Sequence, residues 1–198
     1  MAYFMYGETE LNHLKSKDKK LASAIDRLGF IEREVRPDIF YSLCNSIISQ
    51  QISTAAAASI QARVLALLHE MNPPAILAAD PEALRACGLS VRKVQYIIAT
   101  ATAVHTGTLD LEALRTMPDQ AVIDELIKLP GIGVWTAEML LLFTLQRPNI
   151  VSYGDLAIRR GMMNLYGLKE LPKEKFMRYC KRYAPYGSVA SIYLWALS

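Results

Sequence analysis

The chain has 198 residues, of which 52% are hydrophobic and 21% charged, so it can bury a substantial core as one generous domain or two small lobes. This composition excludes a largely disordered protein, and no uninterrupted apolar run reaches the roughly 18 residues that a membrane span needs. The N-terminus lacks the basic start and apolar stretch of a secretory signal, so we expect a cytoplasmic protein without membrane contact.

The cysteines argue against a disulfide-stapled or metal-binding protein, and the charge is concentrated in one basic segment. Cys44, Cys87 and Cys180 fit neither a disulfide framework nor the ligand spacing of a zinc or iron–sulfur site. The net charge is only +3, but between Arg147 and Arg182 nine basic residues stand against three acidic ones. Such a segment is either a solvated helix surface or a patch that meets an anionic polymer.

The spacing of apolar residues predicts an all-α fold of about ten short helices. In chain order, three-to-four spacing marks DIFYSLCNSIISQQ, STAAAASIQARVLALLHEM, SVRKVQYIIATATAVH and DQAVIDELIKL. Side-chain acceptors or prolines mark four of the helix starts, at Ser53, at Asp80 with Pro81, at Ser90 and at Pro118 with Asp119.

Neither a flexible linker nor a fixed-period repeat divides the sequence. We therefore expect residues 1–198 to form a single compact unit of two helical lobes with a ligand cleft between them. One lobe is expected to cover approximately residues 43–166, and the other residues 1–42 together with 167–198.

The stretch LPGIGVWTAEMLL, residues 129–141, carries the clearest functional signal. Glycine is unfavourable inside a helix, so Gly131 and Gly133 are expected in a short turn that allows close approach of the backbone. Backbone N–H groups at the start of the following helix favour an anion such as a phosphate, which would position a DNA duplex without reading its sequence. A plain helix-to-helix connection is the alternative.

The longer stretch LPGIGVWTAEMLLLFTLQRPNIVSYGDLAIRRGMMNLYG resembles the helix-hairpin-helix DNA glycosylase superfamily. Within it, the chain is most similar to the 3-methyladenine DNA glycosylase II, or alkylbase, branch. SIISQQISTAAAASIQARV, GLSVRKVQYI and YAPYGSVASIYLWAL extend the resemblance to roughly residues 36–198. The resemblance implies a two-lobed all-α glycosylase that lacks the N-terminal β domain of some members.

The resemblance assigns the catalytic carboxylate to Asp155, which taken alone would be an ordinary helix N-cap. A fixed carboxylate can stabilise the positive charge that develops on the sugar as a glycosidic bond breaks. An alkylated purine already carries positive charge, so no strong general acid is required, and His13, His69 and His105 lie in no catalytic motif. Related enzymes that also cut the backbone carry a lysine where this chain has Trp135, which implies a monofunctional enzyme without lyase activity.

The resemblance also implies the residues that contact the damaged base and the DNA. The base pocket is expected to contain Trp135, Met139, Tyr153 and Trp195, with cation–π stacking on the aromatic rings. DNA is expected to contact Gln50, Gln51, Gly131, Ile132, Gly133 and Thr136, with the two glutamines filling the gap left by the extruded nucleotide. No organic cofactor is implied, although the backbone carbonyls of Leu129 and Ile132 could hold a structural Na⁺ or K⁺.

Three positions depart from the pattern of the branch. Gly154 stands where a second acidic residue is common, Gly187 where an arginine is common, and Met139 where an aromatic residue is frequent.

The expected function is excision of bases of the 3-methyladenine and 7-methylguanine type from double-stranded DNA in base excision repair, by a monomer. The alternatives are a glycosylase of the same fold for uracil, hypoxanthine or an oxidised purine, a non-catalytic DNA-binding module, and a helical protein-interaction domain.

Overall fold

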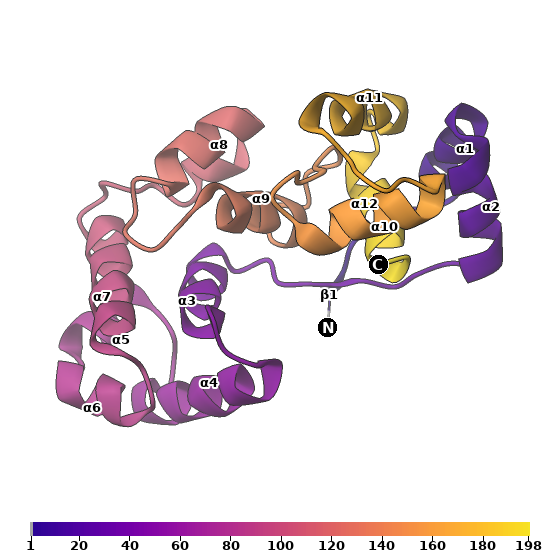
Figure 1. The fold of residues 1–198 in the computed structure, drawn as a ribbon. Coiled ribbons are helices and arrows are strands. Elements are labelled where there is room, and N and C mark those ends of the chain that lie inside the picture. Colours follow the sequence, from indigo (N-terminus) through magenta and orange to yellow (C-terminus); the bar gives the residue numbers. More distant parts are fainter. Residues whose placement is uncertain (1) are drawn as a thin grey trace. The chain divides into compact units, whose positions relative to one another are not determined.

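The computed structural model describes residues 2–198, and the chain divides into two compact units. We call the chain up to Val35 together with Leu141–Ser198 the terminal unit, and Arg36–Leu140 the central unit. Within the described residues there are twelve α-helices, one 3₁₀ helix and one two-stranded ribbon (Figure 1). The all-α fold expected from the apolar spacing is confirmed.

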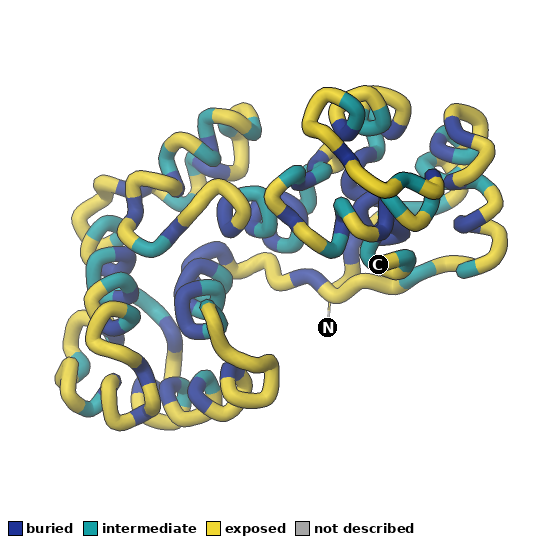
Figure 2. The backbone as a smooth tube through the Cα atoms, viewed as in Figure 1, coloured by how far each residue is buried: buried dark blue, intermediate teal, exposed yellow. Residues whose placement is uncertain are grey.

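The central unit begins with a helix whose apolar side is buried. Its elements are α3 (Ile39–Ser49), α4 (Thr54–Leu68), α5 (Pro73–Ala78), α6 (Pro81–Ala86), α7 (Val91–His105), the 3₁₀ helix η1 (Ala113–Arg115), α8 (Asp119–Leu126) and α9 (Val134–Phe143), of which the last turn belongs to the terminal unit. Figure 2 shows buried residues gathered along α3, whereas α4 and α6 are largely exposed. The side chains of Ser53, Asp80 and Ser90 cap α4, α6 and α7, as their positions in the sequence predict.

The terminal unit packs its helices around the last one. It contains β1 (Ala2–Tyr3), α1 (Glu8–Lys17), α2 (Lys19–Leu28), β2 (Glu34–Val35), α10 (Leu156–Tyr166), α11 (Lys173–Tyr183) and α12 (Gly187–Ala196). The two strands pair antiparallel, with Ala2 opposite Val35. Every residue of α12 from Gly187 to Leu194 is buried, so this helix forms the centre of the unit.

The boundaries of the two units differ from the expected lobes, which placed residues 43–166 together. Residues from Leu141 onwards pack with the N-terminal and C-terminal helices, because α10 lies against α12 and α2. Apolar spacing shows that α10 has a buried side but does not identify the helix that covers it.

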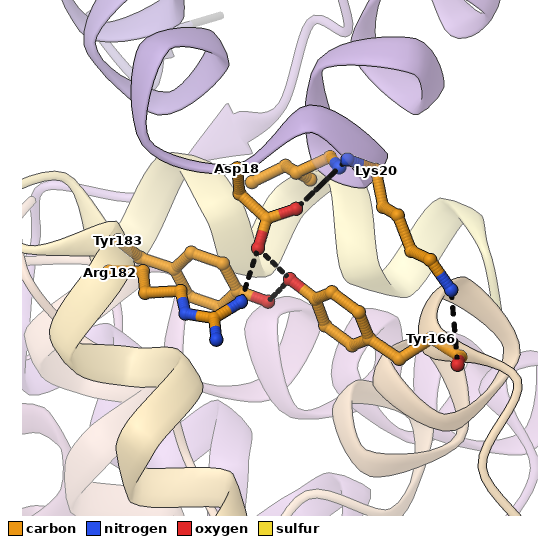
Figure 3. Close-up of polar contacts among 6 residues, drawn as sticks. Asp18, Lys20, Tyr166, Arg182 and Tyr183 are labelled. Carbon is orange, nitrogen blue, oxygen red and sulfur yellow. Dashed lines mark hydrogen bonds and ion pairs between the residues drawn. The ribbon is translucent and has the colours of Figure 1, made fainter.

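A buried polar network ties α10 and α11 to the junction of α1 and α2 (Figure 3). Asp18 is 6% exposed and caps α2 by accepting hydrogen bonds from the backbone N–H groups of Lys20 and Leu21. Its other carboxylate oxygen accepts a 2.7 Å hydrogen bond from the Tyr166 hydroxyl. The same oxygen forms an ion pair with the Arg182 guanidinium at 3.3 Å. The Tyr183 hydroxyl lies 2.8 Å from that of Tyr166, so the network joins three segments of the chain around one carboxylate.

Within residues 2–198, none of the helices combines the length and the apolar character that crossing a bilayer requires.

Candidate active site and nucleic-acid interface

The glycine-bearing stretch forms a tight connection between α8 and α9. Gly131 has φ +84°, and a Cβ atom at this position would lie 2.2 Å from a ring carbon of Tyr96, so both conformation and packing require glycine. Leu129 and Ile132 are buried and anchor the turn. Gly133 has no atom near its missing side chain, which leaves the backbone at the start of α9 accessible.

The two glutamines expected at the DNA surface have different environments. The Gln50 side chain donates a 2.7 Å hydrogen bond to the carbonyl of Gly131, so it fastens the end of α3 to the hairpin turn. Lys93 stabilises the same region by donating to the carbonyls of Ile48 and Gln50, and partial burial lowers the pKa of its amine. Gln51 is exposed at φ +58°, and its side chain makes no hydrogen bond within residues 2–198.

A half-open cavity of about 470 Å³ lies between α3 and α9 in the central unit. Its lining consists of Asn45, Ser46, Ser49, Gln50, Gln51, Trp135, Thr136 and Met139. The Trp135 side chain is 49% exposed, which leaves a large part of it accessible to a ligand, whereas Thr136 is buried. The structure therefore brings together Trp135 and Met139 of the expected base pocket with Gln50, Gln51 and Thr136 of the expected DNA contacts.

Asp155 belongs to the terminal unit, where it caps α10. Its Oδ1 atom accepts a 2.9 Å hydrogen bond from the backbone N–H of Ile158 and a 3.2 Å hydrogen bond from the indole Nε1 of Trp195. The residue is 7% exposed. Two donors on one oxygen fix the orientation of the carboxylate, which a group that must stabilise developing positive charge requires.

Trp195 contacts the carboxylate through a long-range bond that the sequence pattern did not reveal. Its ring stacks on Phe143 with centroids 5.3 Å apart, and the Arg33 guanidinium lies 5.4 Å from the Trp195 centroid and 4.9 Å from that of Phe143. The second expected aromatic residue, Tyr153, packs edge-on against Phe176 and donates to the carbonyl of Leu171 at 3.4 Å. Within the terminal unit, Trp195 is thus a direct neighbour of Asp155.

The loop that precedes Asp155 is held by α12. Ser188 Oγ accepts from the backbone N–H of Ile150 and donates to the carbonyl of Arg147, and Ser191 donates to the carbonyl of Ile150. The sequence did not predict this role of the two serines, because a serine within an apolar helix does not reveal which backbone group it will bond.

Gly187 fits tightly against the same loop. A Cβ atom there would lie 2.7 Å from Asn149 Oδ1 and 2.8 Å from a methyl group of Val151. A larger residue, such as the arginine expected here from the resemblance, would require the side chains of Asn149 and Val151 to shift. Gly154 remains a departure for which the geometry offers no explanation.

The expected cation at the hairpin stays a prediction. The Leu129 carbonyl accepts a hydrogen bond from the Ile132 N–H at 3.2 Å, and the Gly131 carbonyl accepts from Gln50. Among the described residues, no group of three or more His, Cys, Asp and Glu side chains could hold a metal ion.

The fold and these residues define a helix-hairpin-helix protein with a buried carboxylate, and comparison with known proteins identifies its family. Residues 44–185 match the model of the HhH-GPD superfamily base excision DNA repair proteins, and the chain belongs to this family.

Among individual relatives, the chain is similar to proteins named for 3-methyladenine. It is 29% identical to DNA-3-methyladenine glycosylase 1 of Schizosaccharomyces pombe over 196 residues, which cover 96% of this chain and 86% of that protein. It is 31% identical to the putative DNA-3-methyladenine glycosylase YfjP of Bacillus subtilis over 166 residues, covering 79% of this chain but only 58% of YfjP.

Solved structures agree with this assignment. The crystal structure of a DNA-3-methyladenine glycosidase from Bacillus halodurans aligns with a TM-score of 0.89 at 37% identity, covering 99% of this chain and 92% of that one. The S. pombe 3-methyladenine DNA glycosylase Mag1, in complex with abasic DNA, aligns with a TM-score of 0.80 at 28% identity and 95% coverage of both chains.

Proposed function

We propose that the protein is a monofunctional DNA glycosylase that excises alkylated bases of the 3-methyladenine and 7-methylguanine type from double-stranded DNA in base excision repair. The observation that carries the proposal is Asp155, a carboxylate held by two N–H donors at the start of α10. The relatives named as 3-methyladenine glycosylases support the substrate class.

The proposed mechanism assigns the chemistry to one carboxylate. As the bond from C1′ of the sugar to the base breaks, positive charge develops on the sugar, and the Asp155 carboxylate stabilises it and orients the attacking water. An alkylated purine leaves as a neutral base because it already carries a positive charge. The reaction therefore needs no general acid to protonate the leaving group.

Trp135 is proposed to select the electron-poor base. Its half-exposed ring in the cavity offers a stacking surface for an extruded purine, and a cationic base gains a cation–π contribution over a neutral one. Because this position holds no lysine, α9 supplies no amine for a Schiff base with the sugar, which supports a product that keeps an intact abasic site.

The decisive experiment measures base release from methylated duplex DNA. We expect the wild type to release 3-methyladenine and 7-methylguanine, and the Asp155→Asn variant to be slower by at least about 100-fold while still binding DNA. Asp80→Asn is the matched control, since Asp80 also caps a helix, α6, through its side chain, and should retain full activity. Equal rates for the wild type and Asp155→Asn would refute the proposal.

Further measurements test the absence of lyase activity, the preferred lesion, the oligomeric state and the location. Strand breaks should appear only after alkali treatment of the abasic product, and breakage without alkali would contradict the monofunctional assignment. From a panel of duplexes, uracil, hypoxanthine or an oxidised purine should be released more slowly than alkylated bases. The proposed monomeric state can be measured by light scattering, and the proposed cytoplasmic location by fractionation of cells.

A further inference from the structure

The guanidinium group of Arg159, one turn into α10, has a nitrogen without an acceptor among the described residues. The group lies 5.2 Å from the centroid of the Tyr153 ring, which holds it in place. Its Nε atom is covered by the protein and has no hydrogen-bond partner within residues 2–198. Buried polar atoms in folded proteins are nearly always paired, so the guanidinium of Arg159 has donor capacity that the chain itself does not use.

The surroundings of Arg159 are cationic and apolar. A cavity of about 210 Å³ in the terminal unit is lined by Leu156, Arg159, Arg160, Met163 and Leu171, so its lining contains two arginines and no carboxylate. Arg160 is exposed and makes no side-chain hydrogen bond or ion pair within the part of the chain that the structure describes. Leu156, the first residue of α10 and part of the cavity lining, is 65% exposed.

We infer that Arg159 and Arg160 form a binding site for a phosphodiester group of the DNA strand that carries the damaged nucleotide. This inference rests on the proposed function and names the part of the substrate that the cavity receives. A guanidinium presents a planar fork of donors that matches two oxygens of one phosphate. Its stacking on Tyr153 fixes the fork before the ligand arrives, which reduces the entropy lost on binding.

The position of the pair on α10 favours a strand phosphate over a free anion. Asp155 and Arg159 are four residues apart, a rise of about 6 Å, on the same rigid element. A sugar beside Asp155 has a phosphate on each side along the strand, so a flanking phosphate falls within reach of a long arginine side chain. The arginines would thereby set the position of the sugar relative to the carboxylate.

The first test measures the salt dependence of DNA affinity by fluorescence anisotropy, with an undamaged duplex and with a duplex containing an abasic site. For Arg159→Met we expect about tenfold weaker binding at low salt. The slope of log affinity against log salt should fall by about 0.9, the value for one lost phosphate contact. Arg178→Met is the control, because Arg178 is an exposed arginine on α11 outside every cavity described above, and it should behave as wild type.

The second test identifies the phosphate. A neutral methylphosphonate is placed in turn at each phosphate that flanks the abasic site. We expect one position to weaken wild-type binding about tenfold while leaving the affinity of Arg159→Met unchanged, because the contact is already lost. Arg159→Lys should recover part of the salt slope but not the full affinity, since lysine keeps the charge and lacks the fork.

The outcomes separate this inference from the proposed function. If Arg159→Met and Arg160→Met bind with wild-type affinity and slope, or remain fully sensitive to every methylphosphonate, the phosphate site is refuted even when alkylated bases are released. If both variants lose affinity while no base is released by any form of the protein, the phosphate site stands and the glycosylase proposal fails.

Discussion

At the scale of single residues, the orientation of Asp155 depends on Trp195. The indole N–H and the backbone N–H of Ile158 both donate to Oδ1, so one oxygen of the carboxylate is held from two directions. Trp195 is expected near the base pocket, and its ring here also packs on Phe143. The geometry favours a positioning role for this residue.

We predict that Trp195→Phe slows excision without weakening DNA binding. Phenylalanine keeps the aromatic packing on Phe143 but removes the N–H donor, and a hydrogen bond to a charged group contributes about 1.5 to 3 kcal/mol. The single-turnover rate should therefore fall about tenfold or more, while the dissociation constant for duplex DNA stays within about twofold. A wild-type rate in Trp195→Phe would show that the indole does not position Asp155.

Sequence could predict one part of this site and not the other. A carboxylate after a loop and before a helical pattern is a recognisable N-cap, so Asp155 was identifiable from its neighbours together with the resemblance. Its bond to Trp195 spans 40 residues, and the serines of α12 reach the loop over about the same distance. Local patterns carry no information on such pairs, because they arise only when helices distant in sequence pack together.

At the scale of elements, α10 and α12 cross at a glycine. A Cβ atom on Gly161 would lie 1.8 Å from the backbone carbonyl oxygen of Leu194, which precedes Trp195. A backbone carbonyl in a buried helix cannot move aside as a flexible side chain can. The close approach of these two helices therefore sets the distance between the Asp155 end of α10 and the Trp195 end of α12.

Gly161→Ala is predicted to destabilise the protein, although alanine is the better helix former. Overpacking in a buried contact costs about 1 to 3 kcal/mol, and a backbone clash lies at the upper end or beyond. Chemical denaturation should show this loss, whereas Gly133→Ala, with open space around its α-carbon and no positive φ, should change the free energy of unfolding by less than about 1 kcal/mol. A Gly161→Ala variant as stable as the wild type would contradict the assigned contact.

The elements themselves were largely predictable, whereas their grouping was not. The helices of the central unit and the caps at Ser53 and Ser90 follow from apolar spacing and from side-chain acceptors. Assigning α10 to the terminal unit requires knowing that α12 is the helix that covers its buried side. Gly161 marks that surface, but a single glycine in a helical pattern does not reveal which helix approaches it.

At the scale of the whole chain, the Asp18 network joins segments from both ends of the terminal unit. Burial raises the pKa of Tyr166 and of Tyr183 above the usual value of 10.0, and for Tyr166 the neighbouring Tyr183 and Asp18 raise it further. Both phenols remain protonated in the folded protein at pH values at which the unfolded chain ionises them.

Stability is therefore predicted to fall as the pH rises above about 10. The unfolded state binds fewer protons than the folded state in that range, so the free energy of unfolding decreases with pH. Urea denaturation near neutral pH and at about pH 11 should show a steeper loss for the wild type than for the double variant Tyr166→Phe and Tyr183→Phe. Tyr3→Phe, at an exposed tyrosine, is the control, and identical pH profiles for wild type and double variant would rule out this coupling.

The tight fit of Gly187 has a consequence for how such proteins can diverge. Since side-chain atoms of Asn149 and Val151 lie 2.7 and 2.8 Å from where a Cβ atom would stand, an exchange at position 187 requires those side chains to move. Substitutions at the three positions are therefore expected to be coupled rather than additive. Grafting an arginine into this background would accordingly succeed best together with smaller residues at positions 149 and 151.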